Sequence, residues 1–157
     1  MTEDRDLIGL EHAIEQARIG RDEGGVPIGA ALIADDGTVL GVGRNRRVQD
    51  GSAIRHGETD ALENAGRLPA SVYQRSTMYT TLSPCDMCTG AILLYGIPRV
   101  VMGENRSFMG GEDYLRERGV EVINLDSAEC VALMDHFIAE HPEIWFEDIG
   151  IEPGGSR

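Results

Sequence analysis

The sequence predicts a single α/β domain in which part of the sheet is parallel. Three observations support this prediction: the 157 residues suit one domain, the hydrophobic (41%) and charged (26%) fractions are those of a globular protein, and strands alternate with helices in the second half. Strand–helix–strand order requires crossover connections, which make consecutive strands parallel. We expect the domain to cover residues 1–150 and the tail 151–157 to be disordered, because it has little to bury.

The N-terminal part predicts a helix followed by a hairpin. Residues 4–22 carry apolar side chains at helical spacing, and the glycines at 24–25 stop the helix. The apolar run 26–34 is rich enough in Val and Ile to predict a buried strand. The tight turn 35–37 then leads into a second strand over 38–43.

The rest of the chain predicts alternating helices and strands after a polar loop. Gly66 is expected to end the first of these helices, and Pro142 the last, because proline cannot continue a helix. The predicted helices cover residues 56–65, 84–95, 112–118 and 128–140. The predicted strands cover residues 77–82, 99–103 and 121–125.

The charge balance is strongly acidic. Fourteen arginines and no lysines face 27 Asp and Glu, so the formal net charge at pH 7 is −13. Nucleic-acid binders gain affinity from basic side chains that neutralise phosphates, so this balance argues against such a partner. Arg44, Arg46, Arg47 and Arg55 lie close together in the sequence, which fits either a solvated loop or a local anion contact.

The chain lacks the sequence features of a membrane or secreted protein. The longest stretch without a charge, residues 87–98, is shorter than the ~20 apolar residues of a membrane span. The acidic start does not have the order of a secretory signal, and three cysteines, an odd number, do not suit a disulfide framework. We therefore expect a cytoplasmic protein.

Residues with metal-binding chemistry lie in two short segments, His-Gly-Glu at 56–58 and Ser-Pro-Cys-Asp-Met-Cys at 83–88. Pro84 suits the first turn of a helix and Ser83 can cap it. Cys85 and Cys88 then lie on one face, three residues apart, near the positive end of the helix dipole, which favours their thiolates. Two thiolates form half of a tetrahedral zinc site, and His56 is a suitable third ligand.

The number of ligands indicates what kind of zinc site this is. The remaining cysteine, Cys130, lies among apolar residues of a predicted helix and is interpreted as a small core residue. Three protein ligands leave one corner for water, as in catalytic zinc sites. A redox pair is the alternative for Cys-x-x-Cys, but it gives no role to the His-x-Glu segment.

Glu58 is the candidate proton carrier, since a carboxylate near such a water can take its proton without being a ligand. The alternative is an exposed helical glutamate. Residues two apart do not share a face of a regular helix. His56 and Glu58 would therefore converge only if a helix N-terminus pointed at the metal.

The pattern H-x-E…P-C-x-x-C is the signature of zinc-dependent nucleobase deaminases. The segments EGGVPIGA, HGE, LENAGRL, TTLSPCDMCTGAI, YGIPRVVMGEN and WFEDIG resemble the fungal-type cytosine deaminase family, within the cytidine/deoxycytidylate deaminase superfamily, over about residues 10–150. The resemblance implies a three-layer α/β/α fold with a five-stranded mixed sheet. It also implies a homodimer, one zinc ion per chain and a small-molecule nucleobase as substrate, with no nucleic-acid or membrane partner.

The resemblance assigns roles residue by residue. His56, Cys85 and Cys88 match the zinc ligands, and Glu58 matches the proton carrier. The remaining matches are substrate contacts: Asn45 for the ring, the backbone of Gly57 and Ser83 for the base edge, Asp148 for the departing amino group, and Phe108, Trp145 and Ile149 as a lid. Alternatively, Asn45 is a turn residue and the aromatic side chains are core or loop residues.

The implied reaction is hydrolytic deamination of cytosine to uracil and ammonia. Arg55 departs from the family pattern, in which an apolar residue precedes the histidine. If the Arg55 side chain faced the pocket, it would favour a substrate with an extra carbonyl or an anionic group over cytosine. The alternatives are a deaminase of another amino-heterocycle, such as isocytosine or guanine, a tRNA adenosine deaminase, and a zinc-stabilised binding module without turnover. A tRNA enzyme would need a basic surface and an open pocket.

Overall fold

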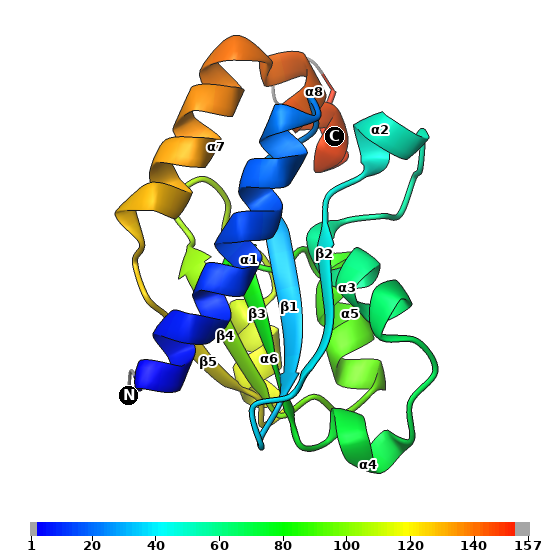
Figure 1. The fold of residues 1–157 in the computed structure, drawn as a ribbon. Coiled ribbons are helices and arrows are strands. Elements are labelled where there is room, and N and C mark those ends of the chain that lie inside the picture. Colours follow the sequence, from blue (N-terminus) through cyan, green and yellow to red (C-terminus); the bar gives the residue numbers. More distant parts are fainter. Residues whose placement is uncertain (1–2, 153–157) are drawn as a thin grey trace.

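The computed structural model describes residues 3–152 and contains a five-stranded mixed sheet (Figure 1). The strands are β1 (Gly29–Ala34), β2 (Val39–Arg44), β3 (Ser76–Leu82), β4 (Arg99–Glu104) and β5 (Glu121–Asn124). Their order is β2-β1-β3-β4-β5, with β1 antiparallel to both neighbours and β3, β4 and β5 mutually parallel. The predicted fold class is therefore confirmed. Residues 153–157 of the predicted tail lie outside the described part.

Helices cover both faces of the sheet. They are α1 (Asp4–Asp22), α2 (Arg47–Asp50), α3 (Gly57–Ala65), α4 (Ala70–Tyr73), α5 (Asp86–Leu94), α6 (Glu112–Glu117), α7 (Ala128–Glu140) and α8 (Pro142–Asp148). In Figure 1, α1 crosses one face of the sheet, with α7 to its side. Within residues 3–152, no helix is long and apolar enough to cross a membrane.

The layers follow from the alternation of side chains along each strand, whose successive residues point to opposite faces. One face packs against α1 and α7 through Ala31, Ile33, Tyr79 and Val101. The other packs against α3, α4, α5 and α6 through Ala30, Leu32, Met78 and Val100. A third cluster joins the residues before β1, the end of β3, α7 and α8; it contains Val26, Ile28, Leu82, Met134, Phe137 and Trp145.

The first strand begins three residues later than predicted. The Ile28 N–H turns back to the Val26 carbonyl oxygen at 2.8 Å, and the Ile28 carbonyl oxygen accepts from the Asn45 N–H at 2.9 Å. Val26 and Ile28 are buried, so their apolar side chains serve the third cluster rather than the sheet. The short helix α2 forms in the segment expected to be a polar loop, and α4 forms in a segment for which no element was predicted.

The helix that carries the cysteines begins at Asp86, two residues later than predicted, and Cys85 is its N-cap. The predicted cap by Ser83 is therefore wrong. The Ser83 hydroxyl instead donates to Glu112 Oε2 at 2.6 Å, and its N–H donates to the Glu104 carbonyl oxygen at 3.0 Å. These bonds hold Ser83 between the end of β4 and the start of α6, and Pro84 lies before the helix rather than in its first turn.

Pro142 ends α7, as predicted, and also occupies the first turn of α8. The result is a sharp change of direction at His141, which lies between the two helices. The C-terminal helix α8 thereby reaches the end of the molecule where α2 lies (Figure 1). Arg47 of α2 pairs with Glu147 of α8 at 2.7 Å.

A buried ion pair fixes α1 to the sheet. Asp6 accepts two hydrogen bonds from Arg99 of β4, at 2.6 and 2.7 Å, and one from the Tyr79 hydroxyl at 3.1 Å. Burial would raise the pKa of Asp6, but the hydrogen bonds and charge of Arg99 outweigh it and lower this pKa below its ordinary value. The ionised carboxylate is therefore part of the folded structure at neutral pH.

Candidate metal centre and substrate pocket

Two helix N-termini meet at the candidate metal centre. His56 is the N-cap of α3 and Cys85 the N-cap of α5, and both have extended backbone conformations. Cys88 is the third residue of α5, so both sulfurs lie at the positive end of that helix. This arrangement answers the question that the spacing of His56 and Glu58 left open. His56 precedes the helix, so helical periodicity does not separate its side chain from that of Glu58.

The spacing of the three side chains fits a tetrahedral zinc ion. His56 Nδ1 lies 3.4 Å from Cys85 Sγ and 3.8 Å from Cys88 Sγ. With Zn–S near 2.3 Å and Zn–N near 2.0–2.1 Å, the nitrogen–sulfur edge of a tetrahedron is about 3.6 Å. Among residues 3–152, these three residues are the group whose donor atoms could hold a metal ion, all within 4.8 Å of one another.

Cys130 lies elsewhere. It is 1% exposed and packs in the cluster between α1 and the sheet. Burial raises its pKa to about 11, so the thiol stays protonated at neutral pH. This environment agrees with the core interpretation.

The ionisable groups of the centre are coupled. The pKa of Cys88 is raised well above its ordinary value, first by its hydrogen bond to Cys85. Burial would lower the pKa of His56, but its hydrogen bond to Cys85 raises this pKa to about 9, so metal binding displaces protons from both residues. A hydrogen bond from Cys88 lowers the pKa of Cys85 to about 4; burial opposes this shift and His56 reinforces it. An ionised sulfur is the form that binds zinc. Glu58 is 4% exposed, and its pKa is raised to about 7, first by burial and then by the charge of Cys85. A carboxyl group with such a pKa can both accept and donate a proton near neutral pH.

A small cavity of about 20 Å³ adjoins this centre. It is lined by Ile28, His56, Glu58, Leu82, Ser83, Cys85, Phe108, Trp145, Asp148 and Ile149. Phe108 and Trp145 meet edge to face, with ring centroids 6.3 Å apart. The cavity lies at the carboxyl end of β3, where open α/β sheets bind their ligands.

Asp148 is the most heavily bonded side chain of the cavity. Its carboxylate accepts from Asn45 Nδ2 at 3.0 and 3.2 Å and from Arg47 Nη1 at 3.3 Å. His56 Nε2 lies 3.6 Å from Asp148 Oδ2. Asn45 is fully buried, and its Oδ1 accepts from the Arg47 N–H at 3.0 Å. The structure therefore brings Asn45 and Asp148 together beside the metal centre, although 103 positions separate them.

Sequence reasoning missed Ile28, Leu82 and Arg47. The signal for the first two was weak, because an apolar residue at a strand end also reads as core. Arg47 belonged to the arginine group whose interpretation stayed open. All four members of that group pair with carboxylates of this chain: Arg44 with Glu23, Arg46 with Asp50, Arg47 with Glu147 and Asp148, and Arg55 with Asp60.

Arg55 is not one of the cavity-lining residues. Its Nε donates to Asp60 Oδ1 at 3.0 Å, and Asp60 lies in the first turn of α3 with 1% exposure. The Arg55 guanidinium thus neutralises a buried carboxylate. This contact gives a structural role to the arginine at position 55, where the family that the chain resembles has an apolar residue.

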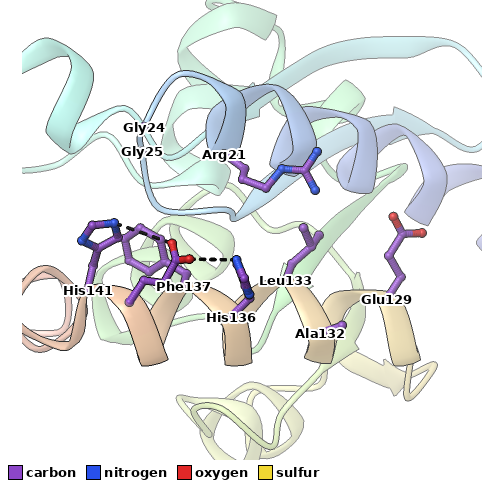
Figure 2. A pocket seen from close by; sticks show the side chains of 10 residues that line it. Arg21, Gly24, Gly25, Glu129, Ala132, Leu133, His136, Phe137 and His141 are labelled. Atoms are coloured by element: carbon purple, nitrogen blue, oxygen red, sulfur yellow. Dashed lines mark ion pairs between the residues drawn. The ribbon is translucent and has the colours of Figure 1, made fainter.

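A separate pocket of about 420 Å³ lies between the end of α1 and α7 (Figure 2). Leu133 and Phe137 form part of its apolar wall, while His136 pairs with Glu140 at 3.1 Å. None of the residues lining this pocket belongs to the metal centre or to the small cavity beside it.

A mixed five-stranded α/β/α fold with one histidine, two cysteines and a buried glutamate at two helix N-termini defines a zinc-dependent deaminase. Residues 3–104 match the cytidine and deoxycytidylate deaminase zinc-binding region, and the chain belongs to this family.

Relatives extend the match over nearly the whole chain. The cytosine deaminase of Candida albicans is 60% identical over 145 residues, covering 92% of this chain and 97% of that protein. A tRNA-specific adenosine deaminase of Streptococcus pyogenes is 30% identical over 144 residues, covering 85% of this chain and 90% of its own. The structure of guanine deaminase from Nitrosomonas europaea shares the fold, with a TM-score of 0.70 and 23% identity over 88% of this chain and 86% of that one.

Proposed function

We propose that residues 1–150 act as a single domain that hydrolyses free cytosine to uracil and ammonia. The observation that carries this proposal is a small cavity that contains Glu58 beside a zinc-type ligand cluster and is covered by α8. The 60% identity to the Candida albicans cytosine deaminase supports the choice of base.

His56, Cys85 and Cys88 would hold the metal. When bound, zinc supplies a Lewis acid that lowers the pKa of water towards neutrality. Glu58 accepts one proton of the attacking water while the water oxygen bonds to the amino-bearing carbon. Glu58 then donates that proton to the ring nitrogen. Glu58 then passes the remaining hydroxyl proton to the amino group; the carbon–nitrogen bond breaks and ammonia leaves.

Residues in and behind the cavity wall recognise the base. Asn45 and the Gly57 backbone, which are buried beside the cavity but do not line it, bond to one edge of the ring. The Ser83 backbone and Asp148, which do line it, contact the departing amino group. Phe108, Trp145 and Ile149 cover the ring and exclude water. All three residues line the cavity, and Phe108 of the loop after β4 meets Trp145 of α8 edge to face, which supports this assignment.

The same features support a free base over a polynucleotide. The cavity holds only about 20 Å³, so even a free base needs its lining side chains to move, and a polynucleotide would need a far larger opening. The four clustered arginines are paired with acids, and the net charge of −13 repels phosphates. We therefore assign no nucleic-acid partner.

We also propose that the protein is a cytoplasmic homodimer acting in pyrimidine salvage. Leu94 and Tyr95, at the end of α5, are 75% and 41% exposed. They border a groove of about 930 Å³ between α3, α4 and α5. A surface with such large exposed apolar residues suits a self-complementary contact between two copies.

The proton-carrier role is tested by Glu58→Gln. The variant keeps all three metal ligands, so we expect it to retain about one zinc per chain while ammonia release from cytosine falls by ~10²–10⁴. Glu63→Gln, an exposed residue of the same helix, is the matched control and should keep wild-type turnover. Near-normal activity of the Glu58 variant would show that another group carries the proton.

A further inference from the structure

Glu112 is a buried carboxylate outside the predicted site. It is 3% exposed and is the first residue of α6. Its Oε2 accepts from the Ser83 hydroxyl at 2.6 Å, and its Oε1 accepts from Asn105 Nδ2 at 3.2 Å. Arg116 Nη2 lies 3.8 Å from Oε1. Burying a carboxylate is costly unless its oxygens are bonded, so these partners explain why the charge is tolerated.

Ser83 is fixed by three hydrogen bonds to the last residue of β4 and the segment that follows it. Its N–H donates to the Glu104 carbonyl oxygen at 3.0 Å, its hydroxyl donates to Glu112, and its Oγ accepts from the Gly110 N–H at 3.0 Å. Within residues 3–152, no group donates a hydrogen bond to the Ser83 carbonyl oxygen, whereas the N–H and hydroxyl groups of Ser83 are both bonded. Ser83 also lines the cavity.

The same segment supports the metal centre and the lid. The Gly111 N–H donates to the Pro84 carbonyl oxygen at 3.0 Å, directly before the ligand Cys85. The Glu104 carboxylate accepts from the N–H groups of Arg106 and Ser107, at 2.7 and 2.9 Å, directly before Phe108. The loop therefore connects the cavity wall, a metal ligand and a lid residue in one hydrogen-bonded unit.

We propose that Glu112 is a positioning residue for the reaction: through the Ser83 hydroxyl it orients the Ser83 carbonyl oxygen towards the amino group of the base. This inference rests on the proposed function. The proposal predicts different effects on substrate and product. Cytosine has an amino group that can donate a hydrogen bond to the Ser83 carbonyl oxygen. Uracil has a carbonyl oxygen at that position and gains none.

The test compares Glu112→Ala, Glu112→Gln and Ser83→Ala with the control Glu117→Gln, an exposed residue of the same helix. We expect Glu112→Ala to lower kcat/KM for cytosine by about 10- to 100-fold, as for loss of a hydrogen bond to a charged group. Glu112→Gln keeps an oxygen that can accept from Ser83 and should lose less than about tenfold. The inhibition constant of uracil should change by less than about threefold in all four, because uracil makes no use of the oriented carbonyl.

Two further readouts decide the result. Zinc content should stay at about one per chain, and combining Ser83→Ala with Glu112→Ala should cost no more than the larger single loss, because both remove one interaction. Unchanged kcat/KM in Glu112→Ala, additive losses, or equal weakening of cytosine and uracil would overturn the inference. Absence of cytosine turnover in the wild type would instead refute the proposed function. The variants would then be compared on the amino-bearing base that the wild type does deaminate, with its own product as inhibitor.

Discussion

Replacement of Asp148 by asparagine removes one charge from the cavity with almost no change in shape. The Asp148 side chain is 2% exposed, and it accepts from Asn45 and Arg47. An asparagine presents one oxygen and one NH₂ group, so the NH₂ would face a donor. Breaking a buried charged pair costs about 3–5 kcal/mol. Taking 3 kcal/mol as the part lost from the transition state, kcat/KM for cytosine should fall about 150-fold.

The adjacent Glu147 is the control for this variant. It binds the same arginine, at 2.7 Å, but its side chain is 64% exposed, and exposed ion pairs contribute about 0–1 kcal/mol. Glu147→Gln should therefore lose less than about fivefold. Ammonia release gives kcat/KM, and metal analysis should find about one zinc in both variants. Equal losses in the two variants would refute the assignment of Asp148 to the substrate, because Arg47 would then account for both.

The remaining predictions concern the metal, the fold and the assembly. Cys88→Ala should lose zinc and Cys130→Ala should keep it, as measured by metal analysis of the purified proteins. Because the folded-state pKa of Asp6 is lowered, its contribution to stability is present above its unfolded pKa of about 4 and is lost as pH falls through the folded value. The melting temperature of Asp6→Asn should thus be lower than that of the wild type at pH 7, with the difference shrinking below pH ~4. Leu94→Glu should convert a dimer to a monomer in sedimentation, whereas Leu7→Glu, also exposed, should not; a wild-type monomer would contradict the proposed assembly.

The metal ligands could be predicted because their signal is local. Cys85 and Cys88 lie one helical turn apart, and both the spacing and the residue type survive the shift of the helix start to Asp86. The later start of the helix could not be predicted, because serine is a common N-cap residue and Ser83 stands directly before Pro84. Its hydroxyl bonds instead to Glu112, 29 residues away. A contact over that distance leaves no periodic pattern in the sequence.

The cavity shows the same limit. Asn45 and Asp148 could be named from resemblance, but their direct hydrogen bond depends on how α8 turns at Pro142. The resemblance implied that residues of the C-terminal segment cover the pocket; the sequence did not predict a second helix there. The role of Arg55 could not be predicted without knowing which group it contacts. An arginine before the metal-binding histidine can face the cavity, and the structure shows that it instead bonds to Asp60.

The most direct test of the account is ammonia release by the zinc-loaded protein from cytosine, cytidine, isocytosine, adenine and guanine at equal concentrations. The account predicts turnover of cytosine and no turnover of cytidine, because α8 covers a cavity of only about 20 Å³ that has no room for a ribose. Efficient deamination of cytidine would contradict it, as would turnover of guanine, or of adenosine in a tRNA anticodon stem, with cytosine inert.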